Sequence, residues 1–381
     1  MNFDLTEDEE MLKAVAERFV ADRYDLDRRR QYLANAAGFS RENWILLGEL
    51  GLIAAPFDSA NGGLGIGPTG LATIFEALGR GLVVEPLAEC AVLAGGLFET
   101  LASDALKANW MPDLIVGKKR LVLAHREHAS RNNASRVETT ARVNGRGVYL
   151  TGTKSLVPSG GTATAFLVSA RVDGGVMERE GVAVFLVDAR AAGLAITPWR
   201  LIDGTVAVSI KLDNVHVDQL SCLGGDCGAI ERAQSRASLV SAAEALGIME
   251  RLFAETLEYL RTRQQFGTPL GKFQALQHRM VAQYAVIEQA RALLDFAMMD
   301  GSAGAIDGAR AFVADVSVSL GHEMIQMHGG MGVTDELSIG HGHKRLVMLS
   351  RWPDDADTAL DRYAACYREG GGRRATSDNA S

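Results

Sequence analysis

The chain has 381 residues, of which 47% are hydrophobic and 23% charged, a composition typical of a globular protein with two or three packed domains. Its formal net charge is -8 without any basic block, which argues against a nucleic-acid partner because phosphate binding needs clustered Lys and Arg. The four cysteines lack the spacing of a disulfide framework, no apolar run reaches the ~20 residues of a membrane span, and the acidic N-terminus is unlike a signal peptide, so we expect a cytoplasmic protein with reduced thiols.

Residues 1–117 read as an N-terminal helical domain. Thr6 is the expected N-cap of the first helix, and Glu9 three residues later completes a capping box. Further helices are predicted around Trp44, over Leu71–Leu82 and over Ala88–Leu106. The Gly-rich stretch 56–68 has no strand before it and no Lys-Ser/Thr after it, so it predicts a connection and not a phosphate-binding loop.

Residues 118–222 read as a β domain. The segments here are short, rich in β-branched residues and alternating in polarity. Turn pairs such as Asn144-Gly145, Asp173-Gly174 and Asp203-Gly204 separate them. Several strands at close spacing predict a small antiparallel barrel or sandwich.

Helical periodicity returns over residues 223–369. The expected helices are Ala229–Tyr259, Phe273–Met299 and Ala305–His328. Residues 370–381 are rich in Gly and Ser, and we predict a disordered tail there.

One stretch, Glu255–Leu294, combines two amphipathic helices with a turn between them. Apolar residues recur mostly at threes and fours in each helix, which predicts one apolar face. Gly267 and Pro269 interrupt the helical pattern. The turn Arg263–Leu270 carries an Arg, two amides and an aromatic ring, which suits an anion and a flat ring system.

The pattern RxxFGxPLxxFQAxQH starting at Arg263, followed about sixty residues later by the run Gln326–Gly332 (QMHGGMG), resembles the acyl-CoA dehydrogenase family. The resemblance covers nearly the whole chain and is nearest to small-subunit-like members of hetero-oligomeric enzymes, such as pimeloyl-CoA dehydrogenase small subunits and subunits of bacterial steroid-degrading enzymes. It implies an α+β fold with an N-terminal helical domain, a middle antiparallel β domain and a C-terminal four-helix bundle. It also implies FAD as cofactor, an acyl-CoA substrate, an oligomer, and an electron-transfer flavoprotein as electron acceptor.

The resemblance implies a set of cofactor-binding residues. In relatives, the Arg and Phe of RxxFG and the Gln and Gly of QxxGG reach across a subunit interface to a neighbour's flavin dinucleotide. A solvated helix-end Arg and a glycine helix cap are the plain alternative. The matching positions here are Arg263, Gln265, Phe266, Gln326, Gly329 and Gly330.

Two segments depart from the family pattern where relatives hold their own flavin. A TEPGAGSD-like run is replaced by residues 123–131, LAHREHASR. A KxWITNG run is replaced by residues 154–160, where Leu156 stands at the Trp position and Pro158 at the Thr position. The half that would hold this chain's own flavin is therefore altered, while the half that reaches a neighbour is kept.

The family's catalytic Glu is missing from both of its usual places. Counting along the sequence places Pro353 at one position and Ala237 at the other. The candidates for a displaced base are Asp354, one residue away, and Glu244, two turns along the same helix as Ala237. The alternative for both is an ordinary surface or helix-pairing carboxylate.

Three functional hypotheses remain open. The chain is a partner subunit that completes a related chain's FAD site, a self-sufficient acyl-CoA dehydrogenase, or a flavin monooxygenase or nitroalkane-oxidase-like enzyme on the same fold. No metal site is predicted, because His322, His328, His341 and His343 form no zinc pattern with a carboxylate.

Overall fold

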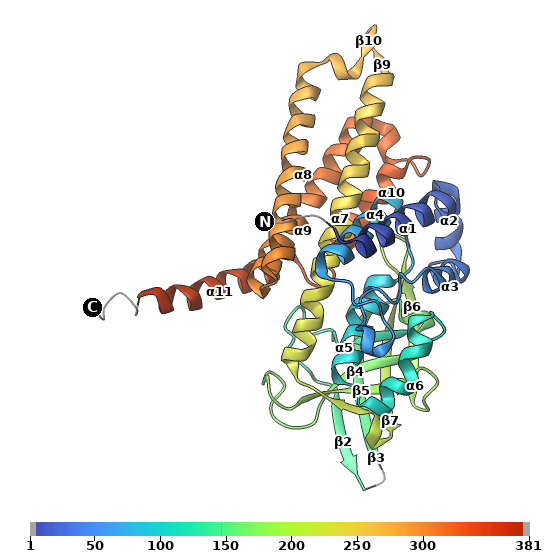
Figure 1. Ribbon diagram of the computed structural model, residues 1–381, viewed down its shortest axis with the longest axis vertical. Coiled ribbons are helices and arrows are strands. Elements are labelled where there is room, and N and C mark those ends of the chain that lie inside the picture. Colours follow the sequence, from blue (N-terminus) through green and yellow to red (C-terminus); the bar gives the residue numbers. More distant parts are fainter. Residues whose placement is uncertain (1–4, 146, 376–381) are drawn as a thin grey trace. The chain divides into compact units, whose positions relative to one another are not determined.

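The computed structural model describes residues 5–145 and 147–375, and its contacts divide into two compact units (Figure 1). The first unit takes the chain up to Leu26, the segment Pro68–Val83 and the chain from Ser238 onward. The second takes Asp27–Gly67 and Val84–Ala237. The expected N-terminal domain is thus shared between the two units, and the boundaries of the three predicted domains stay a prediction.

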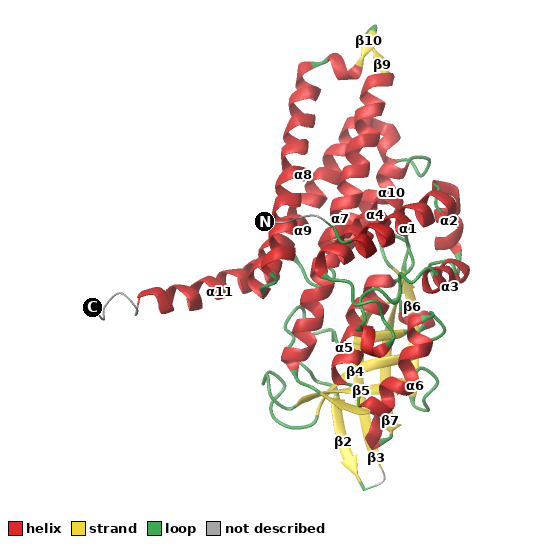
Figure 2. Cartoon of the chain, viewed as in Figure 1, coloured by secondary structure: helices red, strands yellow, loops and turns green. Residues whose placement is uncertain are grey.

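The first unit is helical. α9 packs against α8, α10 and α11, which confirms the predicted C-terminal bundle. The hairpin of β9 and β10 connects α7 to α8 (Figure 2). The elements of the first unit are α1 (Glu7–Arg23), α4 (Pro68–Gly81), most of α7 (Cys227–Thr262), β9 (Gln264–Gln265), β10 (Thr268–Pro269), η5 (Leu270–Lys272), α8 (Gln274–Asp300), α9 (Ala303–His328), η6 (Gly329–Val333), α10 (Ser338–Leu349) and α11 (Ala356–Ala375).

The ends of these helices follow local chemistry. Thr6 accepts a hydrogen bond from the Glu9 amide while the Glu9 side chain accepts one from the Thr6 amide, which confirms the capping box. α4 starts at Pro68, three residues before the predicted start, because Pro suits the first helical position. α11 continues to Ala375, six residues into the predicted tail, and residues 376–381 lie outside the described residues.

Helices α4 and α7 approach each other through two glycines. A Cβ on Gly79 would lie 2.2 Å from the backbone oxygen of Glu244, and one on Gly247 would lie 2.1 Å from that of Glu76. Real Cβ atoms do not come this close, so any side chain at either position would separate the helices. Glycine at these two positions therefore lets the backbones of α4 and α7 come into direct contact.

The second unit is built on one sheet with helices beside it. Its strands follow the order β6-β7-β3-β2-β4-β5-β8, with β1 paired to β4. The elements are α2 (Leu26–Ala34), α3 (Arg41–Glu49), η1 (Ser59–Asn61), η2 (Ala88–Gly95), α5 (Gly96–Leu101), α6 (Asp104–Ile115), β1 (Leu121–Ala124), β2 (Thr140–Asn144), β3 (Gly147–Pro158), η3 (Gly160–Thr162), β4 (Ala165–Arg171), β5 (Val182–Asp188), β6 (Leu194–Arg200), β7 (Val206–Val217), η4 (Gln219–Ser221) and β8 (Cys222–Gly224).

The sheet is mostly antiparallel, as predicted, but β4 has parallel neighbours. β1 pairs with β4 in parallel along its whole length, and β2 does so at one residue pair. The chain leaves β1, forms the β2–β3 hairpin and returns to β4 in the direction of β1. All seven residues of β4 are buried, and η2 packs against β1, so these strands lack the simple alternation of a half-exposed sheet.

The predicted helix Ala88–Leu106 is interrupted in the structure. The buried π-helix η2 continues into α5, and the backbone then becomes extended at Ala102. Ser103 accepts a hydrogen bond from the Leu106 amide and caps α6. The prediction missed this N-cap because apolar residues recur with helical spacing on both sides of Ser103.

Candidate functional site

A sharp hairpin separates α7 from α8. Its two central residues, Phe266 and Gly267, have φ angles of 51° and 75°, as a two-residue type I′ hairpin requires. Phe266 is 90% exposed, and its ring meets the edge of Phe273 at 6.2 Å between centroids. A phenylalanine in left-handed backbone costs free energy and exposes apolar surface, so its presence at this tip points to a binding role.

The cation at the base of this hairpin is available for a ligand. Arg263 is exposed, and its side chain has no hydrogen-bond or ion-pair partner among the described residues. Its backbone amide donates to the Tyr259 oxygen at 2.8 Å, which extends the last turn of α7. Gln265 is also exposed, and its amide nitrogen donates to the Gln264 oxygen at 3.0 Å.

The second predicted segment lies at the end of α9. Gln326 is exposed, and a Cβ on Gly329 or Gly330 would meet nothing within 4 Å. Gly329 has φ 60° and ψ -139°, a conformation that glycine alone adopts without strain. The backbone here is therefore open to close approach by a ligand.

Tyr259 brings the two segments to one end of the bundle. Its ring stacks on His328 with centroids 4.3 Å apart, and its hydroxyl donates to the His328 oxygen at 3.5 Å. Tyr259 is one turn before Arg263, and His328 follows Gln326 by two residues. The structure thus places the hairpin and the glycine turn together within the first unit.

The altered segments of the second unit are bonded to each other. The Nζ atom of Lys154, in β3, donates to a Glu127 carboxylate oxygen at 2.7 Å, to the His125 backbone oxygen at 3.2 Å and to Ser169 Oγ at 3.0 Å. Glu127 also accepts from the amide and hydroxyl of Thr139 at 3.0 and 2.6 Å. The lysine and the carboxylate are both buried, so this ion pair has little contact with water.

Burial controls the titration of this cluster. Desolvation lowers the pKa of His125 to about 3, with a further contribution from the Lys154 charge. Desolvation also lowers the pKa of Lys154 to about 8 against the opposing charge of Glu127. Burial alone would raise the pKa of Glu127, but Lys154 and the hydrogen bonds from Thr139 and Glu138 outweigh it and leave that pKa below its ordinary value.

We expect the second unit to lose stability in acid because of His125. The unfolded chain takes up a proton on this side chain below pH ~6.5, whereas the folded chain does not until about pH 3. Between these values the unfolded state binds more protons, and stability falls by up to about 1.4 kcal/mol per pH unit. Melting temperatures measured from neutral pH down to about pH 4 check this, and His125→Gln should flatten the slope. An equal slope in that variant would contradict it.

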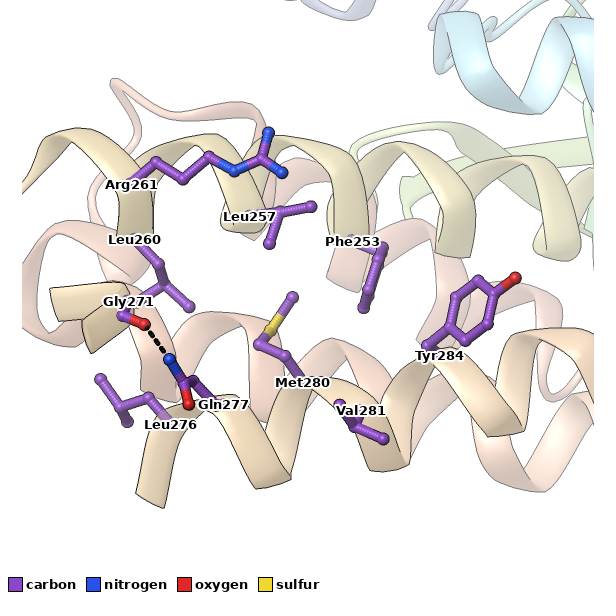
Figure 3. A pocket seen from close by; sticks show the side chains of 10 residues that line it. All are labelled: Phe253, Leu257, Leu260, Arg261, Gly271, Leu276, Gln277, Met280, Val281 and Tyr284. Atoms are coloured by element: carbon purple, nitrogen blue, oxygen red, sulfur yellow. Dashed lines mark hydrogen bonds between the residues drawn. The ribbon is translucent and has the colours of Figure 1, made fainter. Parts of the chain in front are cut away.

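An apolar groove runs between α7 and α8 beside the hairpin (Figure 3). It encloses about 380 Å³, and the side chains of the two helices face each other across it. Tyr284, a member of the predicted apolar face, is 53% exposed, and the neighbouring Val281 is 66% exposed, so part of the groove lies at the surface. The main lining residues are Phe253, Leu257, Leu260, Leu276, Met280 and Val281.

Comparisons with known proteins agree with this architecture. Family models for the N-terminal, middle and C-terminal domains of acyl-CoA dehydrogenase match residues 6–118, 123–215 and 230–353. The chain is 31% identical over 308 residues to "Acyl-CoA dehydrogenase FadE27" of Mycobacterium tuberculosis, covering 77% of this chain and 79% of that protein. The chain belongs to the acyl-CoA dehydrogenase family.

Two solved structures of this family are similar over nearly the whole chain. The ChsE4–ChsE5 complex from Mycobacterium tuberculosis contains a chain with a TM-score of 0.87 and 27% identity, over 97% of this chain and 99% of that one. A variant of the Tcur3481–Tcur3483 steroid ACAD gives 0.85 and 28%, over 96% and 99%. The first name describes a complex, and the second joins the designations of two proteins.

The two candidates for a displaced catalytic base, Glu244 and Asp354, are both bound by arginine side chains. Glu244 is 5% exposed, and Arg345 donates to both of its oxygens at 2.7 and 3.1 Å. Asp354 accepts from Arg310 at 3.2 Å and also pairs with Arg362. Each carboxylate is held by arginine, which occupies the oxygens that would accept a substrate proton.

The residues at the two positions expected for the family's catalytic Glu, Ala237 and Pro353, have no side chain that could act as a base. Ala237 is fully buried, and Pro353 lies in the loop whose Trp352 oxygen accepts from Arg310 at 2.9 Å. Within the described residues, no group of three or more His, Cys, Asp or Glu side chains is placed to hold a metal ion. None of the described helices has the length and apolar character to cross a membrane.

Proposed function

We propose that this chain is a subunit of an FAD-dependent acyl-CoA dehydrogenase, in which it completes the flavin site of a related partner chain. One asymmetry carries the proposal. The hairpin with Arg263 and Phe266 is exposed, and no described residue pairs with the Arg263 side chain. The segments that would hold this chain's own flavin instead carry Leu156 and Pro158 where the family pattern has Trp and Thr.

The residues at the hairpin end of the bundle fit a flavin dinucleotide. The planar guanidinium of Arg263 suits the pyrophosphate oxygens, and Phe266 offers an apolar face to the cofactor. Gln265 and Gln326 offer amides to its adenosine end, and Gly329 and Gly330 allow close approach. When bound, FAD supplies the acceptor for the hydride that leaves the acyl β-carbon.

The remaining chemistry falls to the partner chain. Removal of the α-proton of an acyl-CoA needs a carboxylate beside the α-carbon, and Ala237 and Pro353 cannot accept a proton. The partner therefore supplies the base, and an electron-transfer flavoprotein takes up the electrons. A cytoplasmic location and the acyl-CoA substrate belong to the same proposal.

A self-sufficient homo-oligomer that uses a displaced base is the second candidate. It rests on the burial of Glu244 and Asp354, which keeps both carboxylates away from bulk water. The arginines bound to both carboxylates oppose it. A flavin monooxygenase or nitroalkane-oxidase-like reaction would also require the chain to hold its own flavin.

Flavin content tests the proposal directly. The chain is purified alone and together with a related chain encoded beside it that carries the missing Glu, and bound flavin per chain is measured by absorbance. We expect no flavin in the chain alone, and half as many flavins as chains in the complex. Full loading of the chain alone would overturn the proposal and move attention to Glu244 and Asp354.

Replacing Arg263 with methionine should weaken FAD binding by the complex about 10- to 150-fold. Loss of a charged hydrogen bond to an anion costs roughly 1.5–3 kcal/mol. The measurement is the dissociation constant for FAD after removal and titration of the cofactor, with melting temperature as a check on folding. Arg18→Met is the control, because Arg18 is an exposed arginine on α1. Equal FAD affinity in both variants would count against the role of Arg263.

A further inference from the structure

A polar cavity lies within the first unit, between α1, α4 and α8. It encloses about 410 Å³. Residues three, four or seven positions apart on each helix line it, so one stripe of each helix faces the cavity. The cavity lies near the C-terminal end of α8, whereas the hairpin with Arg263 precedes the first residue of that helix. The lining residues that matter for its chemistry are Lys13, Thr69, Glu76, Arg80, Arg291 and Asp295.

The two arginines of this cavity are already paired within the protein. Arg80 donates to the Glu250 carboxylate at 2.6 Å. Arg291 donates to Glu250 as well, and to Glu76 at 3.3 and 3.4 Å. These bonds join α4, α7 and α8, and they leave neither guanidinium as the main attraction for a ligand.

Other charged groups of the cavity keep unused hydrogen-bonding capacity. Glu76 is 6% exposed, and the arginines meet it at Oε2, so no described residue donates to its Oε1. Asp295 and Lys13 are half-buried, and neither side chain has a hydrogen-bond or ion-pair partner among the described residues. Carboxylate oxygens and an ammonium group therefore line one cavity without being bonded to each other.

Burial makes the two carboxylates unfavourable as they stand. Desolvation raises the pKa of Glu76, although the charges of Arg291 and Arg80 oppose the change. Desolvation also raises the pKa of Asp295 against the charge of Arg291. A cationic group bonded to both carboxylates would stabilise their ionised forms, since a nearby opposite charge favours ionisation.

The signs of the unpaired groups select a class of ligand. A simple amine would satisfy Glu76 and Asp295 but leave the Lys13 ammonium without a partner. A simple carboxylate would pair with Lys13 but meet two like charges in the same cavity. A molecule that carries both an ammonium group and a carboxylate can form charged hydrogen bonds with all three side chains.

We propose that the cavity between α1, α4 and α8 binds a small zwitterion of the amino-acid type, with its ammonium group on Glu76 and Asp295 and its carboxylate on Lys13. Met298 and Met299 line the same cavity and offer adaptable apolar contact to the methylenes between the two charges. The site is built from this chain alone, so it does not depend on the proposed completion of a partner's flavin site.

Calorimetric titration of the full chain with glycine, β-alanine and γ-aminobutyrate tests the site. These probes carry both charges and differ in the number of methylenes between them. We expect at least one to bind with a dissociation constant below about 1 mM, and propylamine and propionate, which each carry one of the charges, to bind at least about tenfold more weakly. Absence of binding by all three zwitterions overturns the inference. Propylamine or propionate binding as tightly as the best zwitterion overturns the proposed ligand class.

Two variants locate the bound zwitterion. D295N and K13M each remove one charge without breaking an ion pair among the described residues, so both should keep the melting temperature of the unmodified chain. Each should weaken binding of the best probe at least about tenfold, because a charged hydrogen bond is lost.

The matched controls are D315N and K344M, because Asp315 and Lys344 are exposed on α9 and α10 and do not line the cavity. Equal affinity in all four variants would place the ligand elsewhere and overturn the inference. Flavin enters none of these measurements, so their failure and the failure of the proposed function are distinguishable.

Discussion

Replacing Arg310 with methionine is expected to lower the free energy of unfolding of the first unit by about 3–5 kcal/mol. Arg310 is 1% exposed and donates to the backbone oxygens of Leu349 at 2.7 Å and Trp352 at 2.9 Å. It also donates to the Asp354 carboxylate at 3.2 Å. Methionine has similar length and no donor, so these buried acceptors would lose their partner.

Thermal unfolding of the full chain measures the effect. For a unit of this size, the change corresponds to a decrease of roughly 6–20 °C in the melting temperature of the corresponding transition. Arg279→Met is the control, since the Arg279–Glu323 pair is over a third exposed on its arginine side and such pairs contribute about 0–1 kcal/mol. A decrease no larger than that of the control would show that the Arg310 contacts contribute little.

Replacing Lys154 with methionine is expected to destabilise the second unit by about 3–5 kcal/mol. The change leaves the Glu127 carboxylate buried without its cation, and Ser169 loses a donor. Replacing Glu127 with glutamine in the same chain removes the uncompensated charge. The double variant K154M/E127Q should therefore be more stable than K154M alone.

A double-mutant cycle measures how strongly Lys154 and Glu127 stabilise each other. Denaturant unfolding of the four chains yields the coupling energy between Lys154 and Glu127, which we expect to exceed about 2 kcal/mol in favour of the pair. Arg136 and Glu138 form an ion pair on the same unit with side chains 37% and 50% exposed, and they serve as the matched exposed pair. Equal coupling in both pairs would show that burial does not strengthen the Lys154 pair.

The sequence predicted most of the fold because its local signals are strong. Capping at Thr6, helical periodicity in the C-terminal half and the turn pairs of the β region all correspond to elements of the structure. The break at Ser103 was missed because the apolar pattern continues through it. The parallel pairing of β1 with β4 was missed because no local signal marks the direction in which a distant strand returns.

The candidate site divides in the same way. The two candidate cofactor-binding segments could be proposed from the sequence because Arg263–Phe266 and Gln326–Gly330 each form a compact motif. The sequence did not predict the Lys154–Glu127 pair, because its two residues meet only when β3 packs beside the segment after β1. The arginines that hold Glu244 and Asp354 come from α9, α10 and α11, so counting along the chain identified the carboxylates without their cations.

The crossing of α4 and α7 has a consequence for how this protein changes over evolutionary time. Gly79 and Gly247 each contact backbone of the other helix, and no rearrangement of nearby side chains can make room for a methyl group there. Neither position can vary alone, and a paired replacement does not help, because the opposing atoms are carbonyl oxygens. An alignment of descendants is therefore expected to show two invariant glycines that touch neither substrate nor cofactor, and invariance alone would misplace them among the binding residues.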